Sequence, residues 1–203
     1  MITLHHAPQS RSTRIIWLLE ELGAPYAIRP VSIYRPMTGV GSPDPTNPHP
    51  DKQVPAITHG ETLVAESVAI VLYLTDAFPA AGLGPLAGDA RRGDYLTWLF
   101  WYAAALEPAM FASFGDELAA SPLKKRSYDA AVARLESALA KGPYLMGEQF
   151  TAVDLLVSSA LNFGRQAFPE SGAFDAFIAR CTARPAARRA AELDTAQGVQ
   201  CAA

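Results

Sequence analysis

The sequence predicts an α/β domain followed by an all-helical domain, and three observations support this division. Strand-like and helical segments alternate before residue 79, in the order β-α-β and then β-β-α. A linker rich in Gly, Ala and Pro follows at 79–88. From Arg91 onward the sequence loses strand-like alternation and is rich in Ala and Leu. We therefore expect domains at residues 1–80 and 88–203.

The β-α-β unit begins with a short strand at residues 2–5. Apolar residues then recur at the spacing of a helix that buries one face: Ile15, Leu18, Leu19 and Leu22. Gly23 follows, where a left-handed residue commonly ends a helix. A second strand is expected within residues 25–33, before a loop rich in Pro, Gly and Ser at 35–51.

A hairpin and a helix complete the α/β domain. Strand candidates at 56–59 and 62–64 are separated by Gly60-Glu61, and a two-residue connection is typical of a hairpin. A helical pattern covers residues 66–78 and ends before Pro79, because proline cannot continue a helix. Helices of the second domain are expected at 90–118, 123–141, 152–167, 173–182 and 185–193.

Composition and charge argue against several classes of protein. The formal net charge of −3 and the pI near 5.8 give no basis for nucleic-acid binding, which requires clustered Lys and Arg. Cys181 and Cys201 are too few for a disulfide framework or a zinc site, which indicates a reducing compartment. The start MITLHHAPQ does not read as a signal peptide, and the apolar run TWLFWYAAAL is too short to span a bilayer. We expect a cytoplasmic protein without a membrane partner.

Histidines near the N-terminus raise the question of a metal site. His5, His6 and His59 match no usual pattern of metal ligands. We therefore expect no metal cofactor.

The turn Gln9-Ser10-Arg11-Ser12-Thr13 joins the first strand to the first helix and carries three hydroxyls beside a cation. These side chains can cap the helix. They can also hold an anion, because free N–H groups and the helix dipole favour negative charge at this end. The residues alone leave both interpretations open.

Pro55 immediately precedes a predicted strand, a position that tolerates the missing N–H of proline. A cis bond between Val54 and Pro55 would turn the backbone N–H and C=O of Val54 outward, like a free strand edge that can bind a peptide. An ordinary trans bond is the alternative, since most X-Pro bonds are trans.

Glu66 and Ser67 stand at the start of the helix at 66–78. Ser67 can be a cap, or its hydroxyl can join the free N–H groups in a carboxylate site. Glu66 suits an ammonium group. A ligand with an amine and a carboxylate on one carbon would fit both residues.

Together these segments resemble the glutathione transferase family over nearly the whole chain. The matching segments, in the family's order and spacing, are SRSTRIIWLLEELGAPY, VPAI, AESVAIVLYL, GEQFTAVDLLVSSAL and RPAARRAAE. The chain is similar to bacterial-type, serine-dependent members of the theta- or nu-like kind. In the fourth segment, Thr151 and Asp154 resemble a capping box.

The resemblance implies an α/β thioredoxin-like N-terminal domain (βαβ-ββα) that binds glutathione as co-substrate, and an all-α C-terminal domain that forms the second-substrate site. It implies a cis bond before Pro55, with the backbone of Val54 paired to the cysteinyl part of glutathione. It also implies that Glu66 and Ser67 hold the γ-glutamyl end.

The glycine carboxylate of glutathione is expected near Lys52 and Gln53. Many family members read Gly-Lys-Val-Pro here, whereas this chain reads Lys-Gln-Val-Pro after a proline-rich loop. His49, Lys52 and Gln53 therefore all stay open as the contact.

Conjugation requires the thiolate of glutathione, and an ordinary cysteine thiol has a pKa of about 8.5. A hydrogen-bond donor, a helix N-terminus and a nearby cation each lower that pKa, and the turn at 9–13 offers all three. The tyrosine-dependent classes carry a Tyr where this chain has His5-His6. The cysteine-dependent classes carry a Cys in the turn, and this turn has none, so a serine-type enzyme remains.

Ser10 is the expected donor, because it stands four residues before Arg14, as the catalytic hydroxyl commonly does in serine-dependent members. Ser12 is the alternative, although we expect it to cap the helix. The backbone N–H of Arg11 is the third possibility, and the Arg11 side chain is the candidate cation.

Aromatic residues of the helical domain are more often core than site. In this family, however, one face of the first long helix lines the electrophile cleft. Trp98 and Tyr102 share a helix face, and they are expected to line the apolar second-substrate pocket with Phe111.

The predicted function is a glutathione transferase of the detoxification type that conjugates the glutathione thiolate to small apolar electrophiles, and the family implies a homodimer. A glutathione-dependent peroxidase, isomerase or dehalogenase would use the same thiolate. A binding module that kept the fold without the chemistry is the non-enzymatic alternative.

Overall fold

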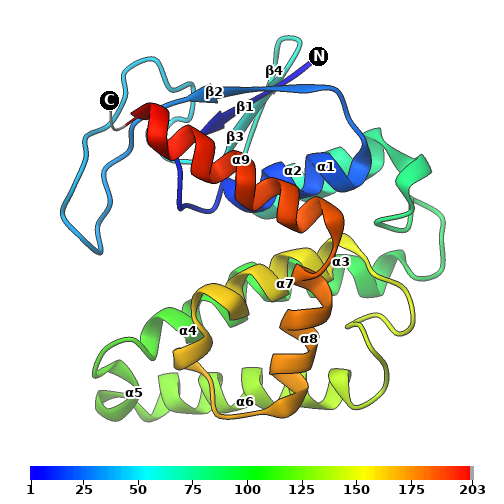
Figure 1. The fold of residues 1–203 in the computed structure, drawn as a ribbon. Coiled ribbons are helices and arrows are strands. Elements are labelled where there is room, and N and C mark those ends of the chain that lie inside the picture. Colours follow the sequence, from blue (N-terminus) through cyan, green and yellow to red (C-terminus); the bar gives the residue numbers. More distant parts are fainter. Residues whose placement is uncertain (202–203) are drawn as a thin grey trace. The chain divides into compact units, whose positions relative to one another are not determined.

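The structure is a computed structural model that describes the backbone of residues 1–201 and the side chains of residues 1–196. It divides into two compact units, which we describe separately (Figure 1). The first contains Met1–Ala81 together with the C-terminal segment that begins at Pro185, and the second contains Gly82–Arg184.

A four-stranded mixed sheet forms the centre of the first unit, and its order is β2-β1-β3-β4. The strands are β1 (Ile2–His6), β2 (Tyr26–Pro30), β3 (Ala56–His59) and β4 (Thr62–Ala65). β1 and β2 are parallel, whereas β1–β3 and β3–β4 are antiparallel. The predicted strands and the two-residue hairpin turn are confirmed, and with its helices this unit has the expected thioredoxin-like fold.

The helices α1 (Thr13–Leu22) and α2 (Ser67–Ala77) pack against each other and against the sheet, and the short 3₁₀ helix η1 (Pro79–Ala81) follows α2. α1 buries four apolar residues completely, each contributing about 1.5–3 kcal/mol: Ile15, Ile16, Leu18 and Leu19. Leu22, expected on the same face, is half-buried. Gly23 ends α1 as predicted. Its φ of 60° is left-handed, which glycine adopts without steric cost.

The last helix, α9 (Pro185–Cys201), belongs to the first unit, where it packs along α1 (Figure 1). The sequence boundaries instead place the expected helix at 185–193 in the helical domain. Two features favour the observed packing. Ala190 is buried, and a small side chain allows two helices to approach closely. Asp194 is also buried and accepts hydrogen bonds from the β1–α1 turn.

The second unit is helical, as predicted (Figure 1). Its elements are α3 (Arg92–Trp101), the π-helical turn η2 (Tyr102–Leu106), α4 (Glu107–Ala112), α5 (Glu117–Ala120), α6 (Pro122–Leu139), α7 (Ala152–Phe163), the 3₁₀ turn η3 (Arg165–Ala167) and α8 (Gly172–Thr182). α7 is its most buried helix. In the part of the chain that the structure describes, no helix combines the length and the apolar character needed to cross a membrane.

The single helix predicted at 90–118 is interrupted by the π-helical turn and ends earlier, at Ala112. Pro108 offers a physical reason. It lacks an N–H, and its ring would clash with the carbonyl four residues before it in a regular α-helix. The wider turn relieves this conflict, and the N–H of Glu107 donates to the carbonyl of Tyr102, five residues back.

The capping box predicted at the start of α7 is confirmed. Oδ2 of Asp154 accepts the N–H of Thr151 at 2.8 Å and its hydroxyl at 2.9 Å. The other carboxylate oxygen accepts the N–H of Leu145 at 2.8 Å. Asp154 thus ties the preceding loop to the most buried helix of the unit.

Candidate functional site

The register of the sheet brings the three predicted glutathione-binding segments to one end of the first unit. His5 of β1 pairs with Ala56 of β3, and Ala56 pairs with Ala65 of β4. β1 ends one residue after His5, β3 begins at Ala56, and β4 ends at Ala65. The turn that carries Ser10, the Val54-Pro55 bond and the Glu66-Ser67 pair therefore lie at the same end of the sheet.

Ser10 lies half-buried within the β1–α1 turn, and Arg11 is exposed beside it. The Ser10 hydroxyl lies 2.6 Å from the carbonyl oxygen of Ala7 and 2.7 Å from the hydroxyl of Ser12. The backbone N–H of Ser12 donates to Oγ of Ser10 at 3.1 Å. The Ser10 hydroxyl is therefore held in place by the turn itself.

Ser12 occupies the N-cap position of α1, but the predicted capping hydrogen bond from its side chain is not formed. Its backbone already has helical angles (φ −72°, ψ −21°), whereas a capping residue is usually extended. Oγ instead lies buried beneath the turn, where it accepts the N–H of Ala7 at 3.2 Å. It also lies 2.8 Å from Nδ1 of His6.

The turn is held from two sides by charged groups that sequence reasoning missed. The guanidinium of Arg35 donates to the carbonyl oxygens of Pro8 and Gln9 at 2.6 and 3.1 Å. Both carboxylate oxygens of Asp194 lie 3.1 Å from the N–H of Gln9, which donates to them, and Oδ1 accepts the hydroxyl of Thr13 at 2.5 Å. Gln9 has a left-handed φ of 53°, and these contacts stabilise that conformation.

His6 links the turn to α9. Its ring is fully buried, with Nδ1 at Ser12 and Nε2 3.4 Å from Oδ1 of Asp194. Burial lowers the pKa of His6, although the Asp194 carboxylate opposes this effect; the charge of Arg35 lowers the pKa further. A histidine at the end of a strand gives no sequence signal for this role, because its partners lie far along the chain.

The other histidines have different neighbours. Nε2 of His5 lies 3.5 Å from the hydroxyl of Thr58, and burial lowers the pKa of His5. Nδ1 of His59 lies 3.0 Å from the hydroxyl of Tyr73. Within the described residues, no group of three or more His, Cys, Asp or Glu side chains has an arrangement that could hold a metal ion.

The Val54-Pro55 peptide bond is cis, as the resemblance implies. Val54 is buried in a small apolar cluster with Ala7 and Val31, which places it beside the turn that carries Ser10. Residue 54 precedes the β3 ladder, and the backbone N–H and C=O of Val54 make no hydrogen bond to any described residue. These groups are therefore available to an extended ligand.

Ser67 is the first residue of α2, and Glu66 precedes it at the N-cap with a left-handed φ of 70°. The Ser67 side chain is buried, and its Oγ has no hydrogen-bond partner among the described residues. The capping interpretation of Ser67 is therefore wrong. A buried hydroxyl without a partner is costly, so its position at a helix N-terminus indicates a place for a ligand.

The loop before Val54 is organised by Asn47, a fully buried residue that sequence reasoning also missed. Its side chain accepts the N–H of His49 at 3.1 Å and donates to the carbonyl of Gln53 at 2.9 Å. The ammonium group of Lys52 donates to the carbonyl of Asn47 at 2.8 Å, and Nδ1 of the buried His49 accepts the N–H of Asp51. The Gln53 side chain is exposed, with no hydrogen bond to another described residue.

Trp98, one of the predicted second-substrate residues, is half-buried in the helical unit. Its ring packs edge-to-face against Trp101 with centroids 5.1 Å apart. The guanidinium of Arg134 lies 4.4 Å from the Trp98 centroid and 4.7 Å from that of Trp101, a cation–π arrangement.

Tyr102 and Phe111 occupy other surroundings. Tyr102 is buried in the π-helical turn, and its hydroxyl donates to Oε1 of Glu107 at 2.6 Å. Phe111 is half-buried and packs edge-to-face against Phe114 at 5.6 Å. Tyr102 therefore presents little side-chain surface to a ligand, whereas Phe111 presents more.

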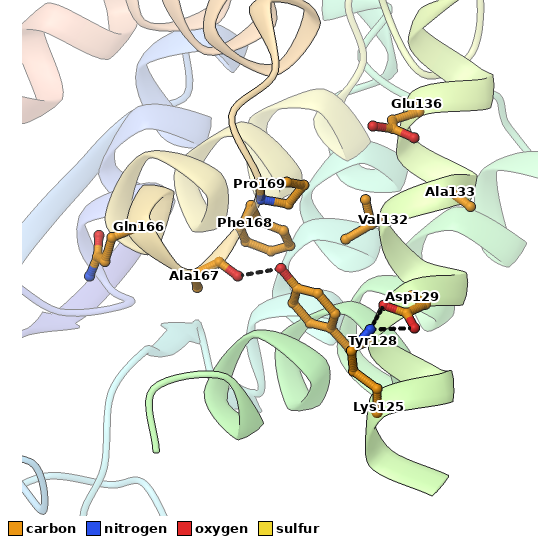
Figure 2. Close-up of a pocket in the computed structure, with 10 residues that line it drawn as sticks. All are labelled: Lys125, Tyr128, Asp129, Val132, Ala133, Glu136, Gln166, Ala167, Phe168 and Pro169. Atoms are coloured by element: carbon orange, nitrogen blue, oxygen red, sulfur yellow. Dashed lines mark hydrogen bonds and ion pairs between the residues drawn. The ribbon is translucent and has the colours of Figure 1, made fainter. Parts of the chain in front are cut away.

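A separate pocket lies between α6 and the stretch formed by η3 and the residues that follow it (Figure 2). Figure 2 shows the hydroxyl of Tyr128 donating to the carbonyl of Ala167 at 2.6 Å, and Lys125 paired with Asp129 at the rim. The lining residues are Lys125, Tyr128, Asp129, Val132, Ala133, Glu136, Gln166, Ala167, Phe168 and Pro169. Trp98, Tyr102 and Phe111 are not among them.

Comparison with protein-family models matches both units. Residues 1–76 match the glutathione S-transferase N-terminal domain, and residues 100–185 match the glutathione S-transferase C-terminal domain. Glutathione S-transferase 3 of Schizosaccharomyces pombe is 29% identical over an alignment of 174 positions, which covers 76% of this chain and 70% of that protein. An uncharacterised glutathione S-transferase-like protein of Streptococcus mutans is 31% identical over an alignment of 173 positions, which covers 72% of this chain and 63% of that protein.

Solved structures with the same fold cover almost the whole chain. A glutathione S-transferase from Actinobacillus pleuropneumoniae has a TM-score of 0.82 and 25% identity, covering 96% of this chain and 93% of its own. A sphingomonad glutathione S-transferase in complex with glutathione has a TM-score of 0.77 and 24% identity, covering 95% and 98%. These likenesses extend over both units.

Proposed function

The chain belongs to the glutathione S-transferase family, and we propose that it is a glutathione transferase that conjugates the glutathione thiolate to small apolar electrophiles. The observation that carries the proposal is the sheet register at His5, Ala56 and Ala65. It sets a hydroxyl-bearing turn, an unpaired strand edge and a helix N-terminus at one end of the sheet. Those are the groups that a thiol, a peptide backbone and a carboxylate require.

Glutathione would bind along this end of the first unit. The backbone N–H and C=O of Val54 would pair with the cysteinyl residue, in the manner of an added strand. The unpartnered hydroxyl of Ser67 would donate to the γ-glutamyl carboxylate at the N-terminus of α2, and Glu66 would accept from the neighbouring ammonium group.

For the glycine carboxylate we propose Gln53, the exposed member of the three candidates. Lys52 donates to backbone carbonyls of its own loop, and His49 is buried with Nδ1 occupied. Lys52 would still contribute positive charge near the carboxylate.

Ser10 would stabilise the thiolate, and Ser12 would support it from beneath. Ser10 is the half-buried member of the pair, while Ser12 has no exposed surface. A hydroxyl that donates to sulfur, the positive end of α1 and the nearby Arg11 charge all favour the ionised thiol. The backbone N–H of Arg11 is a second donor in the same turn.

The helical unit would hold the electrophile, with Trp98 and Phe111 as apolar contacts and Tyr102 supporting them from the core. A cytoplasmic homodimer completes the proposal, by analogy with the family.

A conjugation assay with an activated aryl halide such as 1-chloro-2,4-dinitrobenzene tests the proposed function. Turnover that saturates with glutathione is expected. Turnover only with hydroperoxides would instead indicate a peroxidase. Turnover only with an isomerisable substrate would indicate an isomerase, and turnover only with a haloalkane would indicate a dehalogenase. Failure of both glutathione binding and turnover would favour a non-enzymatic module.

A further inference from the structure

We propose that His6 receives the thiol proton of glutathione through Ser10 and Ser12 and holds it against the carboxylate of Asp194. The inference rests on the proposed function and deepens it. It states where the proton goes when the thiolate forms. His6 would not touch the substrate, so it is a positioning residue that acts through the two hydroxyls.

The resting state follows from counting donors and acceptors. Nε2 of His6 makes no hydrogen bond to a described residue, but it lies 3.4 Å from the carboxylate of Asp194, whose negative charge favours hydrogen on Nε2 and leaves the lone pair on Nδ1. The Ser12 hydroxyl, 2.8 Å away, then donates to Nδ1 rather than to the carbonyl oxygen of Ala7, which lies farther away at 3.2 Å. One lone pair of the Ser12 oxygen accepts the N–H of Ala7, and the other accepts the hydroxyl of Ser10. The 2.7 Å contact between the two hydroxyls requires one hydrogen, and Ser10 must supply it because the Ser12 hydrogen points to Nδ1. The carbonyl of Ala7 shares that hydrogen at 2.6 Å.

In this state Ser10 can accept a hydrogen bond from a ligand. One of its lone pairs takes the N–H of Ser12 at 3.1 Å, and the other is left for a donor outside the turn. The S–H of glutathione is such a donor. A bound thiol would therefore donate to Ser10, which is linked through the Ser12 hydroxyl to the neutral imidazole of His6.

Three proton transfers then convert the thiol into a thiolate. The sulfur gives its proton to Oγ of Ser10, Ser10 gives its own to Oγ of Ser12, and Ser12 gives its own to Nδ1 of His6. The sulfur keeps the electron pair of the broken S–H bond. Both hydroxyls end with one hydrogen each, now pointing the other way, so that Ser10 donates to the thiolate it has helped to form.

The charges around His6 fit this role. Burial and the Arg35 charge lower the pKa of His6, which keeps the resting ring neutral and able to accept. Holding the proton at pH 7 then requires the negative charge of the new thiolate, together with that of Asp194, to raise this pKa once the thiolate has formed. The proton creates an imidazolium beside Asp194, whose carboxylate is itself oriented by Gln9 and Thr13. The arrangement resembles the part that a carboxylate plays beside histidine in a hydrolase triad, where it stabilises the imidazolium.

The test counts protons. Calorimetric titration at pH 7 in buffers of different ionisation enthalpy gives the protons released when glutathione binds, and S-methylglutathione provides the control without a thiol. Ultraviolet absorbance of the same complexes measures the thiolate. The relay predicts a thiolate with almost no proton release beyond that of S-methylglutathione. About one extra proton released per thiolate would show that the proton leaves for solvent, and would overturn the proposal.

The variant His6→Asn keeps a polar group beside Ser12 but cannot accept a proton near neutral pH. Bound glutathione should then either stay a thiol or release about one proton for each thiolate formed. A thiolate formed without proton release in this variant would overturn the proposal. If the variant does not fold, the number of protons that the wild-type protein releases on binding glutathione tests the proposal by itself. A wild-type complex without any thiolate would instead contradict the proposed function, so the two failures are distinguishable.

Discussion

The carboxylate of Asp194, near the C-terminus, lies against the ring of His6 at the end of the first strand, with Nε2 and Oδ1 3.4 Å apart. The same carboxylate accepts the N–H of Gln9. The last helix therefore helps to build the turn that carries Ser10, although the helix and the turn stand at opposite ends of the chain.

Asp194→Ala should destabilise the protein and impair the turn. It removes the charged acceptor of the Gln9 N–H and of the Thr13 hydroxyl, two partly buried hydrogen bonds whose loss costs up to about 1–3 kcal/mol each. Urea denaturation measures the loss. The control is Glu192→Ala, on the exposed side of the same helix, which should change the stability by less than about 0.5 kcal/mol. Equal effects of the two variants would contradict the role given to Asp194.

Ser10→Ala should lower turnover while leaving glutathione affinity nearly unchanged, because its hydroxyl acts mainly on the thiolate. A hydrogen bond to a charged group contributes about 1.5–3 kcal/mol, so the rate at neutral pH should fall by roughly 10- to 100-fold. Steady-state kinetics with glutathione and an aryl halide check this. Unchanged turnover would move the role to Ser12 or to the backbone N–H of Arg11.

Ser67→Ala should weaken glutathione binding by roughly 10-fold or more but should not destabilise the free protein. The hydroxyl is buried without a protein partner, so its removal sacrifices no internal hydrogen bond. Thr75→Val is the matched control. It removes a buried hydroxyl that donates to the carbonyl of Val71 at 3.0 Å, and should cost about 1 kcal/mol. Calorimetry and thermal denaturation separate the two effects. An unaltered dissociation constant for Ser67→Ala would refute its assigned contact.

Asp154 should make the stability depend on pH. Burial raises its pKa from 3.8 to about 6, against the hydrogen bonds of Thr151 and Leu145, which favour the ionised form. The folded state therefore binds the Asp154 proton more tightly than the unfolded state does. Its contribution to stability is fully present below pH 4, and up to roughly 3 kcal/mol is lost as the pH rises to about 6.

The variant Asp154→Asn isolates this contribution. Over pH 4–7, the free energy of unfolding of the wild type should fall relative to that of the variant. Chemical denaturation at several pH values gives the difference. A constant difference across this range would contradict the raised pKa.

Local patterns predicted much of the fold. The hairpin followed from two short strands with two residues between them, α1 from apolar spacing and Gly23, and the α7 capping box from Thr151 and Asp154. In each case the interacting residues are neighbours in sequence, so their spacing carries the geometry.

The parts that were missed depend on residues far apart in the chain. Nothing in the spacing of His6, Arg35 and Asp194 indicates that they meet around one turn. Ser12 looked like a helix cap because its type and position suit one, whereas its side chain turns back to His6. The π-helical turn had a local signal in Pro108, which the long apolar pattern outweighed.

Titration of the purified protein with glutathione by calorimetry, paired with an ultraviolet scan for the thiolate across pH, tests the central claim most directly. The account predicts binding with a thiolate signal at neutral pH, where the free thiol is mostly protonated. Binding without that signal would contradict the mechanism at Ser10. The absence of binding at millimolar glutathione would contradict the proposed function itself.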